Sequence, residues 1–465
     1  MRKLSKNSLL FFVLVISTLI LFSGVFLEFY ATSPYLVALG SLLLVIIIFS
    51  IFLFGENPLL NPLFMFSIMY SGYALGAFYY GFSGGEFGKF IGFLNLSRNE
   101  TEFLMGESLI YSILCYIVFV FGFSLFYKKN LLANNQQRSV TNYFFVVIRY
   151  YKYLCFSLLL IGLLYWIWVS YKVAGGIIQM LLYFQAFGHL VKDADISILP
   201  YHLYYAGIYL WLIAAVLKYR KVSVYFIIFS IVGLIIALST GRITLAFTYI
   251  MAQMIFFYYY FPEKRRRLLF YIFGGFSFSF VVYFLRILSN QYFLGGTLDL
   301  SDTSLMGTII GGGNVADLQQ LVIIFKTFDS TNLLLGSSYL DTFRDTIGVH
   351  FGLEPHSVGL LIKQLYVPNA SGAPTPGAIG EAYANFLYLG PCVMFLVGAS
   401  FSYIYSKVCA SSSPIVIMVY AIFLSRFVFI YPKVDSTMMI NFLWGAMPLL
   451  LAWFLLRIFS SAVRG

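Results

Sequence analysis

Three arginines interrupt apolar stretches of the sequence. Arg242 ends a Ser-Thr-Gly-Arg turn, Arg286 follows a Tyr-Phe-Leu run, and Arg426 follows Phe-Leu-Ser. Ionisable residues at membrane depth are costly and therefore suggest function. A guanidinium group is always charged, and its planar fork of donors matches pyrophosphate. The three arginines predict a site for a phosphate-bearing lipid headgroup. The alternative is that each side chain reaches the interface or pairs with a loop acid.

A histidine near these arginines in the predicted topology is the first candidate for a general base. His356 follows Glu354 by two residues, and imidazole titrates near neutral pH, which suits activation of a sugar hydroxyl. His350 competes with it, and Glu381 or Glu354 is the second choice. A single loop histidine can equally be a hydrogen-bonding residue without a catalytic role.

A Glu-x-Tyr-x-Asn series follows a proline-rich turn. Glu381, Tyr383 and Asn385 enter an apolar stretch after Pro-Thr-Pro-Gly. We interpret the series as a sugar-binding edge, although Glu381 also fits a first-turn acid favoured by the helix dipole. Arg344 is a further candidate for substrate binding. Its spacing from Asp341 favours a simple ion pair within one helix.

The composition defines the class of protein that must position these residues. Of 465 residues, 61% are hydrophobic and 10% are charged, whereas soluble domains carry about 25% charged residues. This excludes a soluble enzyme, a nucleic-acid binder and a disordered scaffold. The four cysteines show no metal or disulfide spacing. We expect an all-α polytopic membrane protein with no metal and no cofactor.

Apolar windows of about 20 residues predict transmembrane helices. Twelve windows satisfy this criterion: 8–28, 35–54, 60–82, 104–127, 153–173, 201–217, 222–240, 243–262, 268–288, 382–406, 412–430 and 437–459. The first could pass for a signal peptide, but it is long enough to span and lacks a convincing cleavage site.

The distribution of lysine and arginine predicts the orientation. With the N-terminus inside, 18 of the 29 basic residues fall on the inner side together with two acids. The inner side then carries a charge of +16 and the rest of the chain −5, as the positive-inside rule requires. We therefore expect both termini inside, and this topology brings Arg242, Arg286 and Arg426 near the outer surface.

The windows divide the chain into three parts. Residues 1–288 hold the first nine helices, residues 289–381 form a long outer loop, and residues 382–465 hold the last three helices. A loop of this length is usually functional. Helical-looking stretches at 316–327, 338–349 and 356–366 predict a partly helical cap over the outer face.

The sequence resembles the oligosaccharide repeat-unit polymerases, the Wzy-type enzymes of O-antigen and capsule synthesis. The resemblance rests on the long outer loop, the Ser-Thr-Gly-Arg turn and one longer motif. That motif is Thr375-Pro376-Gly377-x-x-Gly380-Glu381-x-Tyr383-x-Asn385-Phe386-x-x-x-Gly390. The resemblance covers residues 230–400 in detail, and the rest of the chain is similar only in its hydropathy pattern. The segment from His356 to Gly390 is also similar to O-antigen ligases.

The resemblance implies a metal-independent glycosyltransferase of the GT-C superfamily in the bacterial inner membrane. Such an enzyme takes undecaprenyl-pyrophosphate-linked glycans at the outer face, and its pathway implies a chain-length regulator and a flippase as partners. The outward arginines of the family correspond by topology to Arg242 and Arg286, and Arg426 and Arg344 are further candidates for this role. Two alternatives stay open: an O-antigen ligase, which transfers glycan to the lipid A core, and a flippase for lipid-linked oligosaccharides. A non-enzymatic scaffold gives no reason for the three arginines.

Overall fold

The computed structural model describes most of the predicted helices. The described residues are 33–54, 60–82, 94, 96–127, 143–182, 200–219, 223–239, 243–261, 316–348, 357–366, 368, 374–411 and 413–462. The predicted spans 8–28 and 268–288 lie outside them, as do Arg242, Arg286 and His356.

The secondary structure of the described residues is helical, with no strand among them. Four helices are long and apolar enough to cross a membrane: Pro34–Phe54, Arg98–Phe126, Tyr151–Ala174 and Gly377–Ala410. Shorter apolar helices accompany them at Val224–Ser239, Leu245–Tyr260, Leu318–Thr327, Pro414–Val428 and Phe442–Ile458. The prediction of an α-helical membrane protein is confirmed at this level.

The chain forms two compact units, and the first unit contains residues 1–134, 300–409 and 427–440. Its helices are α2 (Ser33–Phe54), α3 (Pro62–Tyr70), α4 (Gly72–Phe82), α5 (Arg98–Phe126), α14 (Leu318–Thr327), α15 (Ser337–Gly348), α16 (Val358–Tyr366), α17 (Gly377–Phe386) and α18 (Gly390–Ala410). The three helical stretches expected between 316 and 366 are therefore present.

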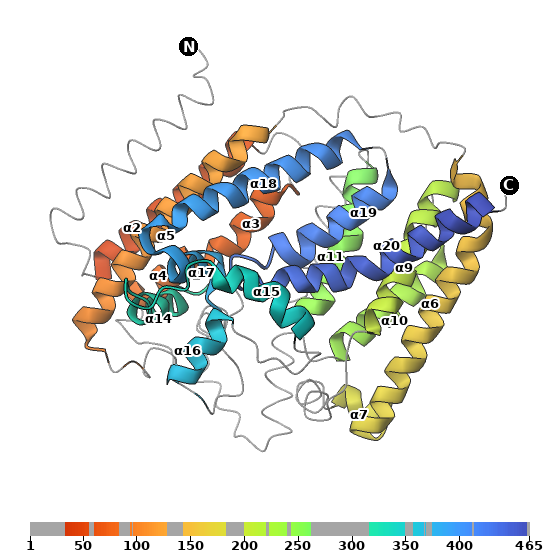
Figure 1. Ribbon diagram of the computed structural model, residues 1–465, viewed down its shortest axis with the longest axis horizontal. Helices are drawn as coiled ribbons and strands as arrows, with labels where there is room; N and C mark the ends of the chain where they lie inside the picture. Colours follow the sequence, from red (N-terminus) through yellow and green to blue (C-terminus); the bar gives the residue numbers. More distant parts are fainter. Residues whose placement is uncertain are drawn as a thin grey trace, which may run out of the picture. The chain divides into compact units, whose positions relative to one another are not determined.

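Helix α14 forms part of the core of the first unit. It packs against α4, α5 and α17, and nine of its ten residues are buried. Helices α2, α4 and α5 lie side by side, and α4 and α5 contact α14 (Figure 1). Helix α5 also approaches α18 closely, because a Cβ on Gly122 would lie 2.1 Å from the carbonyl oxygen of Phe395. Small residues permit such close contact between membrane helices.

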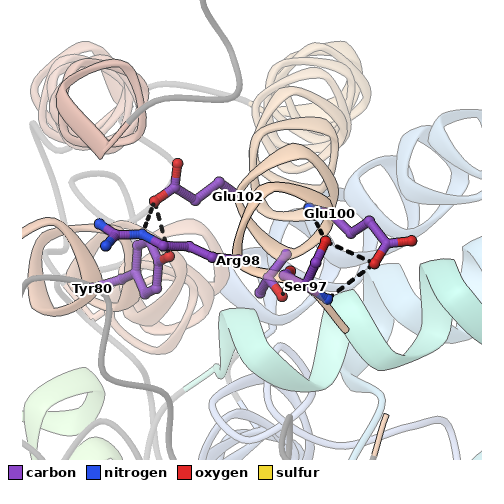
Figure 2. Close-up of polar contacts among 6 residues, drawn as sticks. Tyr80, Ser97, Arg98, Glu100 and Glu102 are labelled. Atoms are coloured by element: carbon purple, nitrogen blue, oxygen red, sulfur yellow. Dashed lines mark hydrogen bonds and ion pairs between the residues drawn. The ribbon is translucent and has the colours of Figure 1, made fainter. Parts of the chain in front are cut away.

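Polar contacts explain where α5 begins. Ser97 caps the helix: its hydroxyl accepts from the Glu100 amide at 3.3 Å, while the Glu100 carboxylate accepts from the Ser97 amide at 3.0 Å (Figure 2). Glu102, about one turn into the helix, accepts from Arg98 Nε at 3.1 Å and from the Tyr80 hydroxyl at 3.2 Å. The helix therefore starts before the predicted apolar window at 104.

The second unit contains residues 135–299, 410–426 and 441–465. Its helices are α6 (Tyr143–Ala174), α7 (Ile177–Leu182), α9 (Tyr201–Tyr219), α10 (Val224–Ser239), α11 (Ile243–Tyr260) and α19 (Pro414–Phe423), together with most of α20 (Met438–Ala462). Helix α9 packs against α6, α10 and α19, and α11 packs against α10 and α19 (Figure 1).

Three predicted spans contain interruptions that the hydropathy pattern did not show. The 60–82 window is two helices, α3 and α4, separated at Ser71. The 382–406 window begins earlier, at Gly377, and breaks at Leu387, whose φ is 48°. Helix α19 changes to a π-helical segment at Leu424–Val428. Hydropathy averages over about 20 residues, so it does not report such local changes of backbone geometry.

Candidate functional site

The described candidate residues are distributed over both units. Arg426 lies in the second unit, and Glu381, Asn385, Tyr383 and Arg344 lie in the first. The remaining candidates, Arg242, Arg286 and His356, are outside the described residues.

The local backbone places Arg426 inside the second unit. The residue sits in the π-helical segment Leu424–Val428, and such segments occur frequently at functional sites. Only 2% of Arg426 is exposed. Gly445 of α20 makes room for the side chain: a Cβ there would lie 2.8 Å from Nη1 and 3.0 Å from Cδ of Arg426.

His202, in the first turn of α9, is the hydrogen-bond partner of Arg426. The Arg426 Nη1 atom lies 3.1 Å from His202 Nδ1, and both residues are buried. Arginine has no acceptor, so Nδ1 must be the acceptor and the ring proton is assigned to Nε2. The histidine is then neutral, and the positive charge of the pair stays on the guanidinium.

An aromatic ring lies close to the guanidinium. Its Cζ lies 5.7 Å from the centroid of the Tyr205 ring, a cation–π distance. Tyr209 also interacts electrostatically with Arg426. The hydroxyls of Tyr205 and Tyr209 are buried and have no hydrogen-bond partner in the described structure.

Most of the donor capacity of Arg426 is unused. Its Nε and Nη2 atoms are buried and, within the described ranges, have no hydrogen-bond partner. The two ion pairs found there do not include this residue. A buried charge without a counter-charge is costly. The arrangement therefore offers donors and one positive charge to an anion.

A polar cluster in the first unit centres on Glu381 of α17, which is 1% exposed. Its Oε1 atom accepts from the hydroxyls of Ser338, at 2.9 Å, and Ser436, at 2.6 Å. Its Oε2 atom accepts from the Ser436 amide at 2.7 Å. The carboxylate thus joins α17 to α15 and to the turn before α20. Buried Asp435 interacts with it electrostatically.

Asn385 belongs to the same cluster, one helical turn after Glu381. Its amide nitrogen donates to the Ser338 hydroxyl at 2.7 Å and to the Glu381 carbonyl at 2.7 Å. Its Oδ1 atom accepts from the Gly336 amide at 2.8 Å. The structure therefore brings together Glu381 and Asn385, and their polar groups connect segments that are distant in sequence.

Tyr383 and Arg344 have different surroundings. The Tyr383 ring stacks on Phe325 of α14 with centroids 3.8 Å apart, and it meets Tyr111 edge-on at 5.4 Å. Arg344 lies on α15 with 45% of its side chain exposed, and its Nη1 atom is 3.8 Å from Asp341 Oδ1. This is the pair within one helix that the spacing predicted.

The sequence interpretation missed several partners. Arg426 contacts His202, and Glu381 contacts Ser338 and Ser436 and interacts with Asp435. No local motif marks these four partners. A usable signal was the predicted topology, which puts the start of the sixth span and the 431–436 connection on the outer side. Among described residues, no group of three His, Cys, Asp or Glu side chains could hold a metal ion.

Comparisons with known proteins do not assign a family to this chain. No protein-family model, curated protein or solved structure matches it.

Proposed function

We propose that the chain is a membrane glycosyltransferase. In this proposal it polymerises oligosaccharide repeat units carried on undecaprenyl pyrophosphate, at the outer face of the bacterial inner membrane. The observation that carries the proposal is Arg426, a buried guanidinium with two unused nitrogen donors and no acidic partner among the described residues. A pyrophosphate would supply the missing negative charge.

The proposed topology has twelve spans with both termini inside, and two contacts support it. Within the second unit, Arg426, in the outer half of the eleventh span, meets His202 at the outer end of the sixth. Within the first unit, Glu381 at the outer end of the tenth span meets Ser436 in an outer connection. Each contact joins residues that the topology assigns to the same membrane level.

The chemistry follows from the charge that develops during transfer. When a sugar hydroxyl attacks the anomeric carbon, the pyrophosphate leaves with increased negative charge. The unused Nε and Nη2 donors of Arg426 would then be more favourable in the transition state than in the ground state. We propose that Arg242 and Arg286 contribute further positive charge.

His356 remains the proposed general base for the acceptor hydroxyl. Glu381, one of the alternative candidates, already accepts three hydrogen bonds and is 1% exposed. These contacts favour a positioning role, in which Glu381 and Asn385 hold the turn before α20. The exposed Arg344 and the stacked Tyr383 are proposed to contact the glycan. Further proposed partners are the lipid bilayer, a chain-length regulator and a flippase.

The test is deletion of the gene in its host, followed by gel analysis of the surface glycan. Complementation uses wild type, Arg426→Ala, Arg426→Lys and, as a matched control, Arg457→Ala, an exposed residue in the same unit. We expect deletion to reduce the ladder to a single repeat on its acceptor. Wild type and Arg457→Ala should restore the ladder, whereas both Arg426 variants should fail at normal membrane levels.

Three results would contradict the proposal or part of it. Complete loss of all repeats on deletion would point to the ligase or the flippase instead. An unchanged ladder would remove the glycan-polymer function for that surface glycan. Restoration of the full ladder by Arg426→Ala would separate the function from the proposed pyrophosphate site.

A further inference from the structure

A second group of unused polar atoms lies in the first unit, at the start of α14. Asp317 caps this helix, and its Oδ1 atom accepts from the Gln319 amide at 2.9 Å. Asp317, Gln319 and Gln320 are 5%, 6% and 4% exposed. The other carboxylate oxygen of Asp317 and the side-chain oxygens of both glutamines are buried without a hydrogen-bond donor from the described residues.

This end of α14 is held firmly, so the free oxygens do not result from a frayed helix. The amide of Ala316 donates to the carbonyl of Met69 at 3.2 Å, which fixes the chain just before Asp317. Leu318 packs closely on α4: a Cβ added to Gly76 would lie 3.0 Å from the Cβ of Leu318. The backbone that carries these acceptors is therefore fixed in position.

Lys433 lies in the turn before α20. Its ammonium group interacts electrostatically with Asp317, but no ion pair joins the two side chains. The turn is fixed nearby, because the Tyr73 hydroxyl donates to the carbonyl of Pro432 at 3.2 Å and Tyr73 also interacts with Asp317. Lys433 is the partly exposed member of the group.

The balance of charges and donors restricts the ligand. A metal cation is disfavoured, because the positive charge of Lys433 shares the site with only one carboxylate. A phosphate is disfavoured, because it would meet that carboxylate and two carbonyl oxygens. A neutral molecule with several hydroxyl groups fits, since each hydroxyl can donate to one of the free oxygens and accept from the ammonium group. Buried acceptors that stay unpaired cost free energy, so such a ligand would gain from pairing them.

We propose that Asp317, Gln319, Gln320 and Lys433 form a binding site for a sugar residue of a glycan. We name it the Asp317–Lys433 site. This inference rests on the proposed function, because that function supplies the glycan substrate. The inference extends the proposed function by assigning recognition of sugar hydroxyls to residues of the first unit. Arg426 of the second unit is assigned to pyrophosphate.

The test measures binding of a glycan that carries no lipid and no phosphate. The probe is the repeat-unit oligosaccharide released by mild acid from the lipid-linked pool of the host. Saturation-transfer NMR on the full chain in nanodiscs compares wild type, Asp317→Asn, Lys433→Met and Arg426→Ala. The matched control is Asp329→Asn, an exposed carboxylate of the same unit. Asparagine caps helices as well as aspartate does, so Asp317→Asn should keep α14 folded.

We expect wild type, Asp329→Asn and Arg426→Ala to bind the oligosaccharide. Asp317→Asn and Lys433→Met should each lose about tenfold in affinity, as expected for loss of a charged hydrogen bond. Equal binding by all variants would overturn the site, and so would absence of binding by wild type. Neither binding result changes the outcome of the glycan ladder test on Arg426. Conversely, a normal ladder with Arg426→Ala, together with oligosaccharide binding that depends on Asp317, would retain this site and remove the pyrophosphate assignment.

Discussion

The Nη1 atom of Arg426 lies 3.1 Å from Nδ1 of His202, although 224 positions separate the two residues in sequence. This contact uses one nitrogen of the guanidinium, and the other two have no hydrogen-bond partner in the part of the chain that the structure describes. The histidine therefore orients the arginine without neutralising it. A positive charge held in this way, away from acids of the described structure, is suited to an anion that arrives from outside.

Replacing His202 should disturb Arg426 without removing its charge. In His202→Ala the Nη1 donor loses its acceptor, and an unsatisfied buried donor costs about 1–3 kcal/mol. We expect a lower midpoint of thermal unfolding in detergent and a weaker glycan ladder. His202→Gln, whose side-chain oxygen can accept the same hydrogen bond, should recover part of both. Identical behaviour of the Ala and Gln variants would argue that the acceptor atom is unimportant.

Adding one methyl group at Gly445 should displace the guanidinium. A Cβ at this position would lie 2.8 Å from Nη1 and 3.0 Å from Cζ of Arg426, which is too close for unstrained contact. We expect Gly445→Ala to abolish or strongly reduce the ladder while the protein still reaches the membrane. The control is Ala446→Gly, which adds no atom and should cost only about 1 kcal/mol of helix stability. A full ladder from Gly445→Ala would mean that Arg426 can move without loss of function.

Glu381 and Ser436 should behave as one unit in stability measurements. The carboxylate accepts from both the amide and the hydroxyl of Ser436, so Glu381→Gln and Ser436→Ala each weaken the same connection. We expect each variant to lose about 1–3 kcal/mol, and the double variant to lose less than the sum. If Glu381 were instead the general base, Glu381→Gln would abolish the ladder while Ser436→Ala kept both the ladder and the stability.

The stability should depend on pH through Asp317 and Lys433. Burial raises the pKa of the Asp317 carboxyl from 3.8 to about 6, so the folded state binds its proton more tightly than the unfolded chain does. Stability should therefore fall as the pH rises through about 4 to 6. Burial lowers the pKa of the Lys433 ammonium from 10.5 to about 8, so stability should rise again above about pH 8.

Thermal unfolding of Asp317→Asn over this range checks the assignment. The variant removes the buried negative charge and should be more stable than wild type at pH 7, by at most about 3 kcal/mol. At pH 4 the two proteins should be similar, because the wild-type carboxyl is then protonated. A constant difference between them from pH 4 to 7 would show that Asp317 does not titrate in this range.

Several features of the fold could be predicted because they are local in the sequence. Apolar windows gave helices at α2, α5, α6, α9, α10 and α11, since about 20 apolar residues are enough to define a membrane helix. The helical stretches near 318–327, 337–348 and 358–366 were also expected. Arg426 was a candidate for the same reason, because a charge within an apolar run is visible without any structure.

Other features depend on contacts between distant segments. The hydropathy pattern gave no sign that α14 lies in a core or that Ser71 divides a predicted span. No motif connects Glu381 with Ser338 and Ser436, or Asp317 with Lys433.

The sequence by itself therefore determined that this is a helical membrane protein with charges in unusual places. Apolarity and charge are properties of single residues and short windows, so they can be read along the chain. Only the tertiary structure decided which charges have partners: Arg344 pairs with Asp341, whereas two nitrogens of Arg426 and one oxygen of Asp317 have no partner among the described residues. Whether a polar atom is satisfied depends on the groups that folding brings within about 3 Å of it.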